Sequence, residues 1–181
     1  KDIASRDFTI NTLYADLSKI KDGEDVDSHI VDLSGARKDL KKKIIRLVSD
    51  RAFQDDPLRL MRAYSLQATL GFKIEAKTAA RIKKDSLLIR NVSMERVREE
   101  LFKILSSPRA YQTLKDMDKA GFLQMVIPQI AVMFGVKQGG YHHLDVWKHS
   151  LEVLRQFELI LEDIKENKEW SGYLNEVVAS N

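Results

Sequence analysis

The pattern of hydrophobic and polar positions changes partway along the chain, and its first part is mixed. β-Branched residues in the segments 30–33 and 43–48 predict two short strands, and the glycine-containing stretch 34–39 predicts the turn between them. The periodicity of residues 6–17 allows a strand or a helix, and we favour a short helix after a strand end. The polar segment 22–29 predicts a loop. We therefore expect a β-hairpin with a long connection in this part.

From Asp56 onward, apolar residues recur at helical spacing. Asp56 is the expected N-cap of the first helix, Pro57 its first helical residue and Gly71 its end. The predicted buried stripe of this helix consists of Leu60, Ala63, Tyr64 and Ala68. Further helices are predicted over residues 78–88, 93–105, 107–121 and 145–164, and the apolar segment 122–134 should break at Pro128.

The predicted fold class is α+β and mostly α, with a small β-hairpin followed by an all-α part. The change in patterning near residue 53 is the expected boundary between the part with the hairpin and the all-α part. We divide the chain into residues 1–52, 53–135 and 136–181.

Composition restricts the classes of function only moderately. Among the 181 residues, 44% are apolar and 31% are charged, as in an ordinary globular protein. The absence of cysteine excludes disulfides, thiolate zinc ligands and a cysteine nucleophile. No apolar run approaches the roughly 20 residues that span a bilayer, so we expect no membrane partner and a cytoplasmic location. The net charge of +3 permits nucleic-acid binding without requiring it.

Asp56 and Arg59 lie three residues apart at a predicted helix start. An ionised aspartate only accepts hydrogen bonds, whereas a guanidinium only donates them. Adenine and cytosine present an amino donor beside a ring-nitrogen acceptor, so this pair could read either base. Uracil and guanine would be mismatched at both groups. The alternative interpretation is an N-cap followed by an exposed arginine, and the spacing alone favours this alternative.

Three segments carry a family resemblance. They are Arg6-Asp7-Phe8-Thr9-Ile10-Asn11, Asp55-Asp56-Pro57-Leu58-Arg59-Leu60-Met61-Arg62-Ala63 and Ser93-Met94-Glu95-Arg96-Val97-Arg98-Glu99-Glu100-Leu101. The first two resemble the nucleotide-recognition motifs, and the third a helix motif, of the tRNA nucleotidyltransferase (CCA-adding enzyme) and bacterial poly(A) polymerase family. The chain departs from the family pattern at Ser5, where an arginine is usual, and at Asp55, where a glutamate is usual.

The resemblance implies a set of nucleotide-binding residues. Asp56 and Arg59 would read the base, and the first motif would handle the ribose and phosphates. Arg96 would either support the base-reading pair or only pack its helix. The full predicted set is Arg6, Asp7, Asn11, Asp56, Arg59, Arg62 and Arg96.

The resemblance also implies an architecture and a reaction. Residues 1–52 would be the C-terminal part of a nucleotidyltransferase head, 53–135 a helical neck and body that binds RNA and nucleotide, and 136–181 the truncated start of an HD-like helical region. In the family, two aspartates hold two magnesium ions, and an RNA 3′ hydroxyl attacks the α-phosphate of ATP or CTP.

Those aspartates precede both motifs in the family. We therefore expect no catalytic residue in this chain, which starts at Lys1 and should be inactive alone, and Mg²⁺ only in a full-length protein. The expected partners are ATP, CTP and the 3′ end of tRNA or another RNA.

Histidines near the C-terminus suggest another chemistry. His149 resembles the first metal ligand of an HD phosphohydrolase, but no later histidine follows, so no complete metal site is expected. Three alternatives to CCA addition therefore stay open: a poly(A) polymerase that uses ATP only, a non-catalytic helical RNA-binding module and a fragment of an HD-type metal phosphohydrolase. The motifs do not separate CCA addition from CC-only or A-only addition, nor do they give the oligomeric state.

Overall fold

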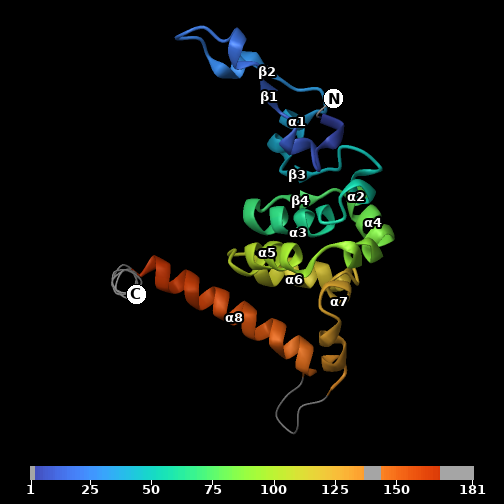
Figure 1. Ribbon diagram of the computed structural model, residues 1–181. Helices are drawn as coiled ribbons and strands as arrows, with labels where there is room; N and C mark the ends of the chain where they lie inside the picture. Colours follow the sequence, from blue (N-terminus) through green and yellow to red (C-terminus); the bar gives the residue numbers. More distant parts are fainter. Residues whose placement is uncertain (1–2, 137–143, 168–181) are drawn as a thin grey trace.

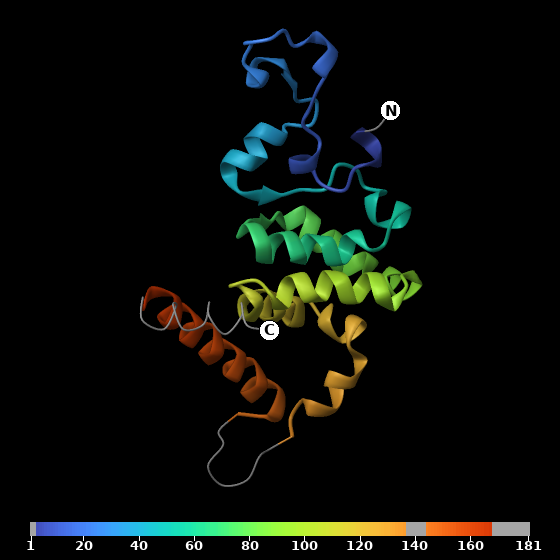
Figure 2. The ribbon, with the colours of Figure 1, turned by 60° about the vertical axis from the view of Figure 1, so that its left-hand side comes forward.

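The computed structural model describes residues 3–136 and 144–167, which form a stack of layers that follows the chain order (Figure 1). The small sheets lie toward the N-terminal end of the stack. The helices α3, α5 and α6 form the middle layers, and α8 projects diagonally from the far end (Figures 1 and 2). The predicted class, α+β and mostly α, is confirmed.

The N-terminal layer consists of short elements. In chain order they are the 3₁₀-helices η1 (Ile3–Ser5) and η2 (Thr9–Asn11), β1 (Tyr14–Ala15), the 3₁₀-helices η3 (Leu17–Lys19) and η4 (Val26–His29), β2 (Ile30–Val31), α1 (Ala36–Lys42) and β3 (Ile44–Ile45).

The remaining elements are mostly helical. They are α2 (Ala52–Asp55), α3 (Arg59–Leu70), β4 (Lys73–Ile74), α4 (Ala76–Asp85), η5 (Ser86–Asn91), α5 (Met94–Leu105), α6 (Ala110–Lys119), α7 (Leu123–Val126), η6 (Pro128–Met133) and α8 (Val146–Glu166).

The predicted pairing of the strands was wrong. β2 pairs antiparallel with β1, so that Tyr14 lies opposite Val31, and β3 pairs parallel with β4, so that Ile44 lies opposite Lys73. The segment expected to be the hairpin turn is largely the helix α1. The two predicted strands therefore belong to different sheets.

A cap explains why this segment is helical. The carboxylate of Asp32 accepts hydrogen bonds from the backbone N–H groups of Ser34, Ala36 and Arg37, at 3.2, 2.8 and 3.0 Å. Such bonds satisfy donors at a helix start that have no partner inside the helix. The chain after Gly35 therefore coils instead of turning back as a hairpin.

The prediction that we favoured for residues 6–17, a short helix, was also wrong. This segment contains the short η2 and then β1, and Phe8 forms an isolated antiparallel bridge with Leu47. Thr9 N–H donates to the carbonyl of Arg46 at 2.9 Å. A long-range backbone contact thus replaces the local hydrogen bonds of a helix.

The helix predicted to begin at Pro57 is present as α3, although it begins two residues later, at Arg59. α3 starts at Arg59 because Pro57 and Leu58 form a turn, which the Asp56 carboxylate closes by accepting from Leu58 N–H at 3.2 Å. Its predicted apolar stripe is buried, since Leu60, Ala63, Tyr64 and Ala68 are at most 4% exposed.

α3 is the centre of the hydrophobic core. A single buried cluster joins Phe8 and Ile45 of the N-terminal layer to Leu60 and Met61 of α3 and to Ile104 of α5. Each fully buried large apolar side chain stabilises the fold by roughly 1.5–3 kcal/mol. These contacts therefore fix α3 against the layers on both sides. Among the helices of the described residues, none is both long and apolar enough to cross a membrane.

The end of α3 should require a glycine at position 71 for full stability. Its φ of 68° is left-handed, and a Cβ atom there would lie 2.9 Å from Arg109 Cζ and Nε. We expect Gly71→Ala to lower the free energy of unfolding by about 1–3 kcal/mol from the backbone conformation, with a further loss from the clash. Urea denaturation followed by circular dichroism measures this loss.

Gly121 provides the matched control for this prediction. It also follows a helix, has a φ of 69°, and its nearest neighbour would lie 4.0 Å from a Cβ atom. Gly121→Ala should cost less than Gly71→Ala, and Arg109→Ala should remove the difference. Equal losses in the two glycine variants would show that the contact with Arg109 is unimportant.

Candidate functional site

A cavity of about 550 Å³ lies where the N-terminal segment meets α3 and α5. The structure brings together residues as far apart in the sequence as Arg6 and Arg96. All seven residues of the predicted nucleotide-binding set line this cavity: Arg6, Asp7, Asn11, Asp56, Arg59, Arg62 and Arg96. The sequence analysis did not single out its other lining residues, Ser5, Leu58 and Leu66, as members of the set.

α3 and the N-terminal segment position most of these side chains, and α5 contributes Arg96. On α3, the residues Arg59, Arg62 and Leu66 are spaced three and four apart, so they share one face of the helix. The N-terminal segment is held by backbone bonds to the chain after β3, including the bond from Val48 N–H to the carbonyl of Asp7 at 3.1 Å. The N-terminal side of the cavity is thus held both by the chain after β3 and by contacts to α3.

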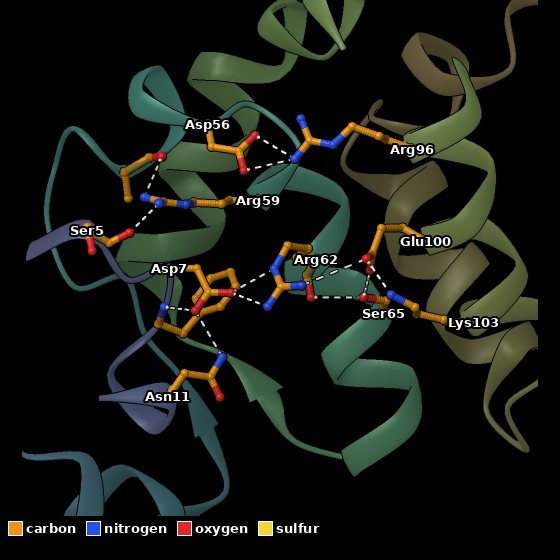
Figure 3. Close-up of polar contacts among 12 residues, drawn as sticks. Ser5, Asp7, Asn11, Asp56, Arg59, Arg62, Ser65, Arg96, Glu100 and Lys103 are labelled. Carbon is orange, nitrogen blue, oxygen red and sulfur yellow. Dashed lines mark hydrogen bonds and ion pairs between the residues drawn. The ribbon is translucent and has the colours of Figure 1, made fainter. Parts of the chain in front are cut away.

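Asp7 is the most constrained residue of the cavity (Figure 3). It is 6% exposed. Its Oδ1 accepts from Phe8 N–H at 2.7 Å and from Asn11 Nδ2 at 2.9 Å, and its Oδ2 lies 2.8 Å from Arg62 Nε and 2.7 Å from Arg62 Nη2. Burial by itself raises the pKa of Asp7, but the hydrogen bonds from Asn11, Phe8 and Arg62 together hold that pKa below its usual value.

A second carboxylate supports Arg62 from α5. Glu100 is buried, and its Oε1 lies 3.9 Å from Arg62 Nη1 and 2.7 Å from Lys103 Nζ. Ser65 Oγ donates to Glu100 Oε2. These contacts continue the polar network from the N-terminal segment through α3 to α5 (Figure 3).

The sequence analysis included Glu100 only as part of the third motif and did not predict this contact. A usable signal was present, because Val97, Glu100 and Ile104 lie on one helical face, and all three are buried. A carboxylate in an apolar stripe needs a charged or hydrogen-bonding partner.

The Asp56 carboxylate is held by Arg96. Arg96 Nη2 lies 3.2 Å from Asp56 Oδ2, and both side chains are partly exposed. Arg59 is held differently, because its Nη1 donates to the carbonyl of Ala52 at 3.1 Å and its Nη2 to the carbonyl of Ser5. Asp56 and Arg59 therefore share the cavity but each is oriented by other partners (Figure 3).

The cavity is electrostatically suited to an anionic ligand. Four arginines and two aspartates line it, which gives an excess of positive charge. Guanidinium groups bind phosphate oxygens with charge-assisted, often bidentate hydrogen bonds. A ligand that carries both phosphates and a hydrogen-bonding ring would match the set of groups present.

The structure supplies no metal centre in the part of the chain that it describes. Within residues 3–136 and 144–167, no group of three or more histidine, aspartate or glutamate side chains is placed to hold an ion. His149 lies in the first turn of α8, where its backbone N–H donates to the carbonyl of Asp145 at 2.9 Å. His142 and His143 lie outside the described residues.

The sequence is similar to tRNA nucleotidyltransferases and matches one RNA-binding family. Residues 71–134 match a family described as the probable RNA- and SrmB-binding site of polymerase A. The chain is 32% identical to an A-adding tRNA nucleotidyltransferase of Deinococcus radiodurans, over 97% of this chain and 40% of that protein. It is 31% identical to a CC-adding tRNA nucleotidyltransferase of Thermus thermophilus, over 85% of this chain and 34% of that protein. The chain thus spans about two fifths or less of these relatives.

Solved structures show the same similarity. A CCA-adding enzyme of Thermotoga maritima complexed with tRNA matches 71% of this chain and 30% of its own, with a TM-score of 0.63 and 27% identity. A CCA-adding enzyme of Bacillus stearothermophilus in complex with CTP matches 67% of this chain and 29% of its own, with a TM-score of 0.59 and 31% identity.

Asp7 should make stability sensitive to acid. Because its pKa is lowered on folding, its contribution is fully present above the unfolded value, about 3.9, and is lost as the pH falls through the lower folded value. We expect Asp7→Asn to unfold at a lower urea concentration than the wild type at pH 7, and this difference to shrink below about pH 4.

Urea midpoints measured from pH 7 to about pH 3 check this expectation. Asp39, whose pKa is also lowered although burial raises it, adds to the acid sensitivity, so the variant should lose only part of it. Asp22→Asn, at an exposed position in the loop after η3, is the control and should change the midpoint little. A difference between wild type and Asp7→Asn that stays constant over the whole range would contradict the prediction.

Proposed function

We propose that this chain, which belongs to the tRNA nucleotidyltransferase and bacterial poly(A) polymerase family, carries the base-selecting site of an enzyme that adds AMP and CMP to an RNA 3′ end. The observation that carries the proposal is the shared cavity of Asp56 and Arg59 with the motif of residues 6–11. Because the chain spans only part of its relatives, the activity, the RNA and the nucleotides are all parts of the proposal.

In this proposal, Asp56 and Arg59 form a template for the base. The Asp56 carboxylate would accept from the exocyclic amino group of adenine or cytosine, and Arg59 would donate to the adjacent ring nitrogen. Arg96 orients the carboxylate, and the carbonyls of Ser5 and Ala52 orient the guanidinium. Since these partners are already in place, binding would require little reorganisation of the two reading groups.

The polar groups around Asn11 and Arg62 would hold the sugar and phosphates. Asn11 uses Nδ2 to donate to Asp7, so its carbonyl oxygen can accept from a ribose hydroxyl. Arg62 is fixed between Asp7 and Glu100, and Arg6 lines the same cavity. These arginines are suited to the triphosphate of the incoming nucleotide.

The reaction joins the RNA to this nucleotide. The RNA 3′ hydroxyl attacks the α-phosphorus, a new phosphodiester forms, and the bond to the leaving pyrophosphate breaks. The residues of the described segments do not form a magnesium site, and we assign no catalytic step to them. Their proposed part is to bind, orient and select the nucleotide.

We retain the division of the chain as part of the proposal. Residues 1–52 would belong to a catalytic head, 53–135 to a neck and body that contact RNA, and 136–181 to an HD-like region. The match of residues 71–134 to an RNA-binding family supports the second assignment. The description of that family also favours the alternative of a poly(A) polymerase that uses ATP only.

Nucleotide binding to the chain tests the base template. We expect ATP and CTP to bind more tightly than GTP and UTP, by roughly 5- to 150-fold for each mismatched group, because one unpaired polar group in a closed site costs about 1–3 kcal/mol. Arg59→Ala should remove most of this preference. Competition against a fluorescent ATP analogue measures all four affinities under one condition.

Arg98→Ala is the matched control, because Arg98 is an exposed arginine on α5 outside the cavity lining. It should leave the preference unchanged. Equal binding of all four nucleotides by the wild type would contradict the proposed base template. RNA binding that is insensitive to Arg59→Ala, together with no nucleotide preference, would favour the non-catalytic module, whereas ATP binding without CTP binding would favour poly(A) addition.

A further inference from the structure

The short helix α2 contacts both members of the proposed base-reading pair. The carbonyl of its first residue, Ala52, accepts from the backbone N–H of Asp56 at 3.2 Å and from Arg59 Nη1 at 3.1 Å. The backbone position of Asp56 and the orientation of Arg59 therefore depend on where α2 lies. A helix of four residues is too short to be stable by itself, so other parts of the fold must hold α2 in place.

Two kinds of contact hold α2. Ala52 and Phe53 are fully buried, and this burial keeps α2 against the core without specifying its rotation, because the hydrophobic effect is not directional. A hydrogen bond is directional, and Gln54 makes one to the neighbouring helix α4. Its Nε2 donates to Asp85 Oδ2 at 3.0 Å, where α2 and α4 lie side by side (Figure 1). This bond therefore constrains the rotation of α2.

Asp85 occupies an unfavourable position for an aspartate. It is the last residue of α4 and is only 9% exposed. The helix dipole disfavours a negative charge at a helix C-terminus, and a buried charge needs a partner. Arg81 supplies such a partner, because its Nε lies 2.5 Å from Asp85 Oδ2. Residues that break a local rule in this way are expected where function requires them, and the contact with α2 is a candidate for that requirement.

We propose that Gln54 and Asp85 are positioning residues of the base-reading pair. Asp85 fixes the rotation of α2 through Gln54, and α2 presents the Ala52 carbonyl to Asp56 and Arg59. Gln54 and Asp85 lie outside the lining of the candidate site, so they act through α2 without touching the nucleotide. The inference rests on the proposed function, because it concerns the two reading groups of that site.

An exchange of donor and acceptor tests the hydrogen bond. Gln54→Glu keeps the shape of the side chain but replaces the donor by a carboxylate, which Asp85 repels. Asp85→Asn alone keeps an oxygen that can accept from Gln54. In the double variant, the new amide at position 85 can donate to the new carboxylate at position 54. The bond is then restored with its polarity reversed, and the set of variants forms a double-mutant cycle.

The side-chain NMR resonances of Arg59, recorded on the isotopically labelled chain without nucleotide, are the first measurement. Arg59→Ala identifies these resonances. We expect Gln54→Glu to shift or broaden them, because the Ala52 carbonyl moves relative to the guanidinium. The double variant should return them to their wild-type positions. Arg59 resonances that Gln54→Glu leaves unaltered would overturn the proposal.

Nucleotide competition measures the effect on selection. Gln54→Glu should weaken the binding of ATP and CTP about 3- to 10-fold, because a displaced Arg59 weakens one hydrogen bond to the base. The affinities for GTP and UTP should change little, since the phosphate-binding groups are unaltered. If α2 and α4 were joined only for stability, the variant would weaken all four nucleotides equally or would lower only the urea midpoint. Either of these results would overturn the proposal.

Gln112→Glu is the matched control. Gln112 is exposed on α6, and its Nε2 donates to Asp116 Oδ1 at 2.9 Å, so the variant also places a carboxylate against an aspartate. It should leave the Arg59 resonances and the nucleotide preference unchanged. The same changes in both variants would show a general effect of charge and would overturn the proposal. If the Arg59 resonances respond as expected but the wild type binds all four nucleotides equally, the positioning stands and the proposed function fails.

Discussion

The contact between the buried Asp7 carboxylate and the Arg62 guanidinium is the interaction on which the candidate site depends. A buried charge is tolerated only when it is paired and hydrogen-bonded, and Asp7 meets both conditions through Arg62, Asn11 and its neighbouring backbone. The same contact joins the N-terminal segment to α3. Glu100 extends it to α5, so three layers of the fold are aligned by one chain of charges.

α3 gives this alignment its rigidity. Its apolar stripe is buried in the core, while another face of the helix lines the cavity of the candidate site. A shift of α3 would move Arg59 and Arg62 together, because both lie on this helix. The buried stripe opposes such a shift, because each large side chain that left the core would lose about 1.5–3 kcal/mol. The core packing of α3 therefore also fixes the two arginines that this helix contributes to the site.

The sequence predicted what depends on local periodicity and failed where distant segments meet. The stripe of α3 and the ends of α5 follow from side chains three and four positions apart, and both were found. The sheets could not be predicted, because each strand has two residues and its partner is chosen by long-range contacts such as that between β3 and β4. The site residues came from motifs and a chemical argument, which named seven of the residues that line the cavity but did not predict the contacts of Glu100 and Ser5 that hold them.

The separate anchoring of Asp56 and Arg59 explains how the cavity can keep both groups available. A direct bidentate ion pair between them would use the two carboxylate oxygens and two guanidinium donors on each other. Instead, Arg96 lies against the carboxylate, and backbone carbonyls accept from the guanidinium. Carbonyls are neutral, so they orient Arg59 without neutralising its charge. An acceptor and a donor that do not satisfy each other are what a base with its own donor and acceptor needs, and this separation follows from the positions of α2, α3 and α5 in the fold.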